Sequence, residues 1–155
     1  MTDPRRANAK FRQLIRRVNL YPPYLGMGIR MRSFSEDFTR FEVELRARWY
    51  NRNLFGTHFG GCLYSMADPF YVFIVTMNLG GGYIVWDRSA QIDFLRPARG
   101  TITGIFEIGR ERLEQIRAEV DALGKKVYRF ETDLTDASGQ AVAHVTKDVH
   151  VRSKG

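Results

Sequence analysis

The chain has 155 residues, enough for a single domain with a full hydrophobic core, and its hydrophobic fraction of 44% is ordinary for a globular protein. Its one cysteine, Cys62, excludes an internal disulfide and indicates a reducing, cytoplasmic location, and the charged N-terminus lacks the apolar segment of a secretory signal. The net charge of +7 lies entirely in residues 1–32, which contain eight basic residues against Asp3, because the rest of the chain has sixteen residues of each sign. A basic N-terminus of this kind either binds an anionic partner or forms a solvated face.

The N-terminal segment is expected to form an amphipathic helix. Asp3-Pro4 has the composition of a helix start, and apolar residues then recur at helical spacing opposite the arginines: Phe11, Leu14, Ile15 and Val18. The helix should end near Asn19, before Pro22-Pro23. Residues 1–24 are therefore interpreted as a basic helix with a proline linker, and residues 25–155 as one domain. Peripheral membrane contact through the basic helix is an alternative to a solvated face. Nucleic acid is not expected, because no aromatic residues interleave with the arginines.

Strand-like sequence precedes and follows a central apolar stretch. Residues 25–34 are a predicted strand, and residues 40–49 alternate strictly, with Trp49 on the apolar face. Helical spacing predicts a short helix over residues 111–123. Further strands are predicted after the central stretch, the last two joined by a hairpin: 83–95, 101–110, 126–136 and 140–152.

The strand over residues 83–95 contains two aspartates. Simple alternation puts Trp86 on one face, with Ala90, Ile92 and Phe94, and puts Asp87 and Asp93 together on another. Both aspartates are expected to face solvent or to pair with a neighbouring arginine rather than to act in catalysis.

The central stretch runs from Asn53 to Leu79. It opens with a glycine-containing turn and then carries too many large apolar residues for a single stripe, which is typical of a buried helix. A membrane span is disfavoured because the run contains Asp68 and Pro69 and has no flanking basic anchors. We therefore expect an α+β fold in which an antiparallel sheet wraps around this helix.

Asp68 is the carboxylate of interest within the apolar run. Apolar surroundings disfavour a charged carboxylate, so one interpretation is a general base or an anchor for an attacking water. The other interpretation is structural, because Asp-Pro is a helix-start signature. In that case Gly60 to Ala67 would form a separate short piece, and Asp68 would cap the helix that follows.

Gly60 and Gly61 stand at the predicted helix start. Their backbone N–H groups are open to approach, and unpaired N–H groups at a helix start favour anions or a carbonyl oxygen that gains negative charge. The alternative is that the two glycines only make a tight turn.

These residues, with their order and spacing, resemble the hotdog-fold thioesterases. The pattern comprises Asn53, then Phe59-Gly60-Gly61, then Ala67-Asp68, and after the next strand Phe94-Leu95-Arg96-Pro97-Ala98. Phenylacetyl-CoA-type thioesterases have His-Gly-Gly where this chain has Phe59-Gly60-Gly61. With Ala-Asp-Pro and Tyr-Ile-Val-Trp-Asp at 83–87, the chain resembles the DUF4442 branch still more.

The resemblance implies hydrolysis of acyl-CoA or acyl-carrier thioesters by a cytoplasmic homodimer or tetramer, with the site at the dimer interface. Gly60, helped by Gly61, would polarise the thioester carbonyl, Asp68 of the partner subunit would activate water or attack directly, and Asn53 would position the water or the turn. The remaining expected contacts are an acyl pocket lined by Phe59, Tyr64 and Met66, and coenzyme phosphates bound by Arg96 or Arg99.

Two departures from the family pattern support an alternative from another class. Phe59 replaces the usual histidine, and Pro69 directly after Asp68 could turn that carboxylate into a cap that faces away from the groove. The alternative is a non-catalytic module that binds acyl groups or lipids. No metal is expected, because the three histidines have no metal spacing with Cys62 or with each other, and coenzyme A is expected only as part of the substrate.

Overall fold

The computed structural model describes residues 13, 15 and 17–154. The helix expected up to Asn19 therefore lies largely outside the described residues. Within them, Ile15 is buried in the hydrophobic core, and a turn of 3-10 helix, η1, covers Val18–Leu20. The side chain of Asn19 then bonds both the N–H and the carbonyl of Met31, which ties this segment to the first strand.

The proline pair lies in a helix where we expected a linker and the start of a strand. Helix α2 covers Pro22–Met27, and proline suits a first turn because its missing N–H would be unpaired there. Gly28 ends the helix with φ 75°, and a Cβ at this position would lie 2.5 Å from the side-chain nitrogen of Asn51. The first strand therefore begins at Ile29, and Tyr24 of α2 is buried.

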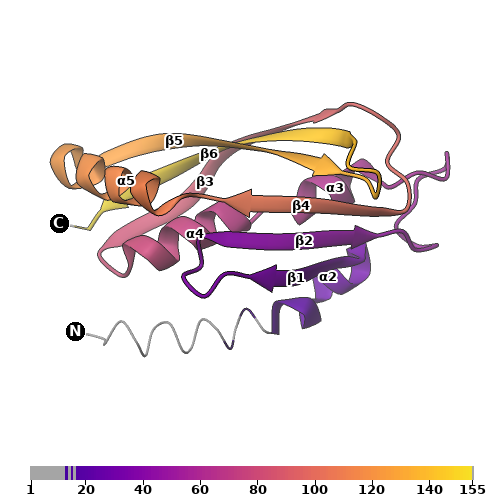
Figure 1. The fold of residues 1–155 in the computed structure, drawn as a ribbon, viewed down its shortest axis with the longest axis horizontal. Coiled ribbons are helices and arrows are strands. Elements are labelled where there is room, and N and C mark those ends of the chain that lie inside the picture. The colour runs from indigo at the N-terminus through magenta and orange to yellow at the C-terminus, as the bar shows by residue number, and fades with distance from the viewer. Residues whose placement is uncertain (1–12, 14, 16, 155) are drawn as a thin grey trace.

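Six strands form one antiparallel sheet in the order β1-β2-β4-β5-β6-β3 (Figure 1). Their bounds are β1 Ile29–Phe34, β2 Arg40–Arg46, β3 Tyr83–Phe94, β4 Thr101–Glu107, β5 Lys125–Thr135 and β6 Ala141–Ser153. The order puts β3 at one edge of the sheet, paired only with β6. The strand bounds agree with the predictions to within about one residue, except that β1 starts later than predicted and β2 and β4 end earlier.

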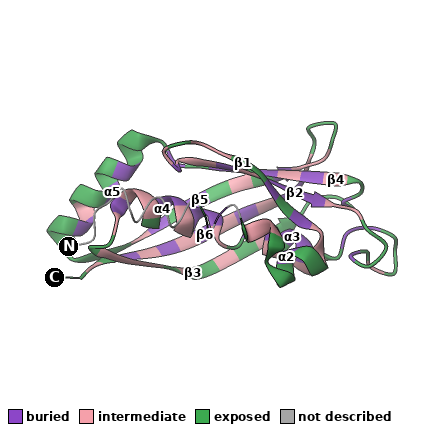
Figure 2. Ribbon diagram, turned by 90° about the horizontal axis from the view of Figure 1, so that it is seen from below, coloured by how far each residue is buried: buried purple, intermediate pink, exposed green. Residues whose placement is uncertain are grey.

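The central helix consists of two pieces, α3 over Gly60–Met66 and α4 over Phe70–Leu79. Both lie along one face of the sheet (Figure 2), and Phe70 stacks on Phe106 of β4 at a centroid distance of 5.0 Å. The predicted short helix is α5, Arg110–Leu123, which ends at Gly124. The expected architecture, a sheet wrapped on a buried apolar helix, is confirmed. Among the described residues, no helix has the length and apolar character needed to cross a membrane.

Two predictions of strand faces were wrong. Trp49 lies beyond the end of β2 and is 88% exposed, because the strand stops at Arg46 and the chain turns. In β3 the register with β6 shifts between Asp87 and Ser89, as in a β-bulge. The extra residue reverses the alternation, so Asp87 faces the helix, whereas Trp86 faces outward and stacks on His150 at 4.1 Å.

Candidate functional site

Asp68 lies in the break between α3 and α4. Pro69, not Asp68, is the N-cap of α4, and no side-chain hydrogen bond caps that helix. The separate short piece before Asp68, which the structural interpretation expected, is present, but Asp68 does not cap the helix that follows. The Asp68 side chain is 60% exposed. A carboxylate that caps nothing and reaches solvent is available to a ligand.

Beneath Asp68 lies Lys147 of β6, whose side chain is only 1% exposed. Its ammonium nitrogen Nζ is 3.4 Å from Oδ1 of Asp68 and 2.9 Å from Oδ2 of Asp87. The ring centroid of Tyr64, on α3, lies 5.8 Å from the same nitrogen. A buried ammonium is tolerated in a core only when such partners compensate its lost hydration.

Asp87 completes this cluster from β3, and it was expected to face solvent or an arginine. Instead it forms an ion pair with Lys147, because the bulge turns it toward the helix. Its second oxygen, Oδ1, is buried and accepts no hydrogen bond from the described residues. Burial raises the pKa of Asp87, and the hydrogen bond and charge of Lys147 oppose that rise.

The turn before α3 is organised by Asn53. Its Nδ2 donates to Oγ1 of Thr57 at 2.8 Å and to the carbonyl of His58 at 3.3 Å. Its Oδ1 accepts from the N–H groups of Phe55 and Thr57. Of the two roles expected for Asn53, these hydrogen bonds favour positioning the turn, because the amide is already engaged within it.

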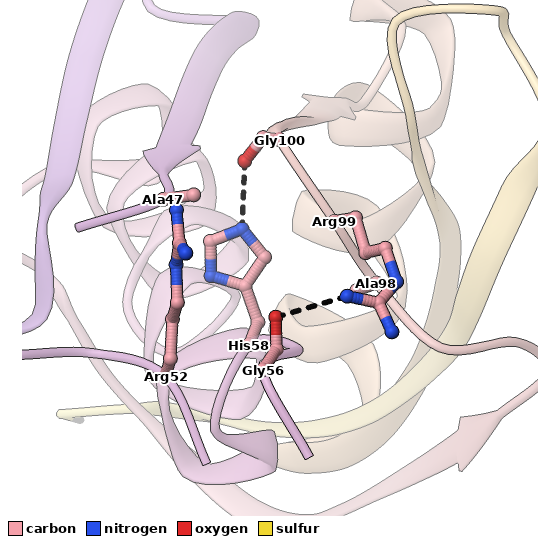
Figure 3. A pocket seen from close by; sticks show the side chains of 7 residues that line it. All are labelled: Ala47, Arg52, Gly56, His58, Ala98, Arg99 and Gly100. Carbon is pink, nitrogen blue, oxygen red and sulfur yellow. Dashed lines mark hydrogen bonds between the residues drawn. The ribbon is translucent and has the colours of Figure 1, made fainter. Parts of the chain in front are cut away.

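His58 joins this turn to the segment after β3. Its Nε2 lies 2.8 Å from the carbonyl oxygen of Gly100, so Nε2 carries the proton and Nδ1 is an acceptor, which has no partner among the described residues. Burial lowers the pKa of His58, which keeps the ring neutral. The ring lines a cavity of about 110 Å³, between Arg52 and Arg99 (Figure 3).

Phenyl rings lie against the two glycines at the start of α3. A Cβ on Gly60 would lie 2.9 Å from the ring of Phe94, and one on Gly61 would collide with the ring of Phe59. A side chain at either position would force the neighbouring ring to move, so glycine permits the close approach of the rings. Within the described chain, neither glycine N–H donates to a backbone carbonyl, since the first such bond at this helix start comes from Cys62.

The remaining predicted residues lie in different surroundings. Phe59 and Tyr64 are exposed at the surface. Met66 is fully buried in the core, so it does not line a surface pocket with them. Arg96 donates to the side chain of Gln140, and Arg99 donates to the carbonyl of Gly56 at 3.2 Å. The structure therefore brings Tyr64 and Asp68 together around Lys147, and it brings Phe59 and Phe94 to the glycines.

Sequence reasoning missed Lys147, although its signal is visible in the chain. Val145, Lys147, Val149 and Val151 occupy alternate positions of β6, and all four are buried. A lysine in a row of inward valines indicates a compensated buried charge. Asp87 was harder to find, because its inward orientation depends on the bulge. No group of three potential metal ligands occurs among the described residues.

Comparisons with solved structures identify the fold. The chain is similar to PA5026 of Pseudomonas aeruginosa, a protein of unknown function described as a probable thioesterase, with 22% identity, a TM-score of 0.81, and coverage of 91% of this chain and 95% of that one. It is also similar to the Haemophilus influenzae thioesterase HI1161, at 16% identity and a TM-score of 0.65, over 88% and 87% of the two chains. A third is the E. coli PaaI protein of the phenylacetic acid degradation operon, at 19% identity and a TM-score of 0.57, over 86% and 85%.

At these identities the likeness establishes the fold alone, and with the six-stranded sheet it confirms the predicted hotdog fold. No match was found among curated proteins. Residues 9–151 match the family described as a domain of unknown function, DUF4442. The chain belongs to the DUF4442 family.

Proposed function

We propose that this protein hydrolyses acyl-CoA or acyl-carrier thioesters, with Asp68 as general base or nucleophile. The observation that carries the proposal is the carboxylate of Asp68, which is exposed, caps no helix and lies directly above a buried ammonium. It belongs to a chain whose similar structures include proteins described as thioesterases. A carboxylate held at a solvent-facing break can accept a proton from water or attack a thioester carbon.

The proposed site needs two chains. Gly60 begins α3 and Asp68 follows its end, so the seven residues of α3 separate them by about 10 Å within one chain. In a homodimer, Gly60 of one chain can face Asp68 of the partner subunit. The surface that contacts the partner would be the free edge of β3, because Trp86, Phe94 and Leu95 are exposed along this edge and at its end. A dimer that buries them would also cover unpaired strand groups.

In the proposed reaction, the N–H of Gly60, helped by Gly61, donates to the thioester carbonyl as negative charge develops on its oxygen. Asp68 of the partner removes a proton from water while the resulting hydroxide attacks the carbonyl carbon. The carbon–sulfur bond then breaks, and the leaving thiolate takes up the proton that Asp68 removed from water, which restores the Asp68 carboxylate. Asn53 keeps the turn in place, and Phe59 and Tyr64 would contact the acyl group. Arg99 or Arg96 would meet the coenzyme phosphates.

The alternative is a hotdog module that binds acyl groups or lipids without hydrolysis. The phenyl rings at Gly60 and Gly61 favour it, because ring packing alone explains why both residues are glycine. In that function the same dimer groove would hold the acyl chain, and Asp68 would not take part in chemistry. Peripheral membrane contact through the basic N-terminus would suit such a module, but those residues lie mostly outside the described chain.

The two functions separate in one experiment. Thioester hydrolysis is measured over acyl-CoAs from acetyl to long-chain and aryl, for wild type, Asp68→Asn and the control Asp93→Asn. Asp93 is an exposed aspartate of β3 that bonds Gln91, outside the cluster. We expect Asp68→Asn to lose turnover by about a hundredfold or more with the fold intact, and Asp93→Asn to retain it. Equal rates in all three proteins would exclude Asp68 as base or nucleophile, and no turnover with retained acyl-CoA affinity would favour the binding module.

A further inference from the structure

We propose that Lys147 is a positioning residue that holds the carboxylate of Asp68 in its working orientation. This inference rests on the proposed hydrolase function, which it deepens. The buried ammonium of Lys147 contacts Oδ1 of Asp68 at 3.4 Å, which leaves Oδ2 for a water or substrate. The proposal explains why a charged residue occupies the row of buried valines on β6.

A purely structural ion pair would need only Asp87. That carboxylate is the nearer partner of Lys147, at 2.9 Å, and its side chain is 25% exposed, against 60% for Asp68. The second contact, at 3.4 Å, joins Lys147 to a carboxylate that is 60% exposed, so screening by solvent weakens its contribution to stability. Its effect is directional. Within the described chain, the Asp68 carboxylate has no other hydrogen-bond donor, so Lys147 alone limits its rotation.

The charge balance leaves a negative charge on the outer carboxylate. One ammonium and two carboxylates, from Lys147, Asp87 and Asp68, sum to a net −1 when all are ionised. Tyr24 of α2 faces the cluster as a neutral phenol, since burial and then the charge of Asp68 raise its pKa. Tyr64 of α3 contributes its ring to Lys147. Asp87 therefore keeps Lys147 compensated in the core, and Asp68 is the carboxylate of the cluster that is open to solvent.

The test compares Lys147→Met with wild type in the acyl-CoA assay. Methionine keeps the length of the side chain and removes its charge. We expect kcat to fall about 10- to 100-fold with KM changed less than about threefold, because substrate contacts remain. Lys147→Met should cost nothing further in an Asp68→Asn background.

A double variant separates loss of activity through lost positioning from loss of activity through unfolding. Lys147→Met combined with Asp87→Leu removes both buried charges, and the same fall in kcat is expected with the far-UV spectrum of wild type. An unchanged kcat in this variant, beside an inactive Asp68→Asn, would overturn the role of Lys147 and leave the hydrolase function standing.

Crystal structures provide a readout that does not need activity. Wild type should show Asp68 in one conformer against Lys147, and the Lys147→Met/Asp87→Leu variant should show it in several. A single unchanged conformer in both would contradict the proposal even if neither protein hydrolyses a thioester. Absence of turnover in wild type and Asp68→Asn alike would instead reject the proposed function on its own.

Discussion

The two ends of α3 use their polar groups in opposite ways. At the start, the turn over residues 53–59 uses its polar side chains to hold backbone: Asn53 bonds the turn itself, and Nε2 of His58 bonds the carbonyl of Gly100. At the end, the break over residues 67–69 leaves Asp68 exposed above a buried lysine. The turn therefore fixes the backbone, whereas the break presents a charge. A short helix between glycines and proline can therefore have a hydrogen-bonded turn at one end and an exposed carboxylate at the other.

The largest expected effect concerns the buried charge at the break. Lys147→Met leaves the half-buried Asp87 without its cation, and we expect the free energy of unfolding to fall by about 3 kcal/mol, the lower end for a broken buried ion pair. Adding Asp87→Leu should recover most of that loss, because an apolar pair replaces the ion pair. Urea denaturation measures both. The matched control is Arg129→Met, which removes an exposed pair with Asp148 at 2.8 Å and should cost no more than about 1 kcal/mol. Similar losses of unfolding free energy in Lys147→Met and Arg129→Met would mean that the Lys147–Asp87 pair contributes no more than an exposed pair.

A smaller effect is expected at the turn. Asn53→Ala removes two donated and two accepted hydrogen bonds that are local to the turn, and should lower the free energy of unfolding by about 2 kcal/mol. Hydrogen exchange at Phe55 and Thr57 should also accelerate, because their N–H groups lose an acceptor. Asn78→Ala serves as control, since Asn78 bonds two backbone carbonyls elsewhere. Unaltered exchange at the turn would refute the organising role of Asn53.

The smallest effect concerns His58 and depends on pH. Burial lowers its folded-state pKa, so at pH 8 the ring is neutral in both folded and unfolded chains. As pH falls below about 6.5, the unfolded chain takes up the proton first, and the native state loses stability. His58→Leu should cost about 1 kcal/mol at pH 8, through the lost bond to Gly100, and less at pH 5.

Thermal unfolding at the two pH values tests this expectation. His144→Leu is the contrasting control, because the hydrogen bond to Asp133 raises the pKa of His144. Its contribution should therefore be present at pH 5 and lost as pH rises. A His58→Leu cost that does not change with pH would contradict the burial effect.

Much of the fold could be predicted from local pattern. The strand alternation of Phe41, Val43 and Leu45 and the helical spacing of Leu113, Ile116 and Val120 both appear as buried faces. The break at Asp68-Pro69 was also predictable, because proline cannot continue a helix. Two predictions from local pattern were wrong. The proline pair begins helix α2 instead of a linker, and β2 ends before Trp49, which is exposed.

The candidate site was predicted only in part. Asp68, Gly60 and Asn53 are recognisable from residue type and spacing along one stretch. Their surroundings are not, because Lys147 lies 79 positions after Asp68 and meets it only when β6 lies under the helix break. Asp87 joins them because one extra residue in β3 reverses the direction of its side chain.

The sequence by itself determined the elements, their order and the resemblance to hotdog proteins, since these depend on periodicity, glycine and proline within short windows. Only the tertiary structure decided which charges share a site. Strand pairing between residues far apart and the bulge in β3 set which side chains point inward, and burial then required that Lys147 and Asp87 compensate each other. That pairing of a buried ammonium with one half-buried and one exposed carboxylate is a property of the folded chain.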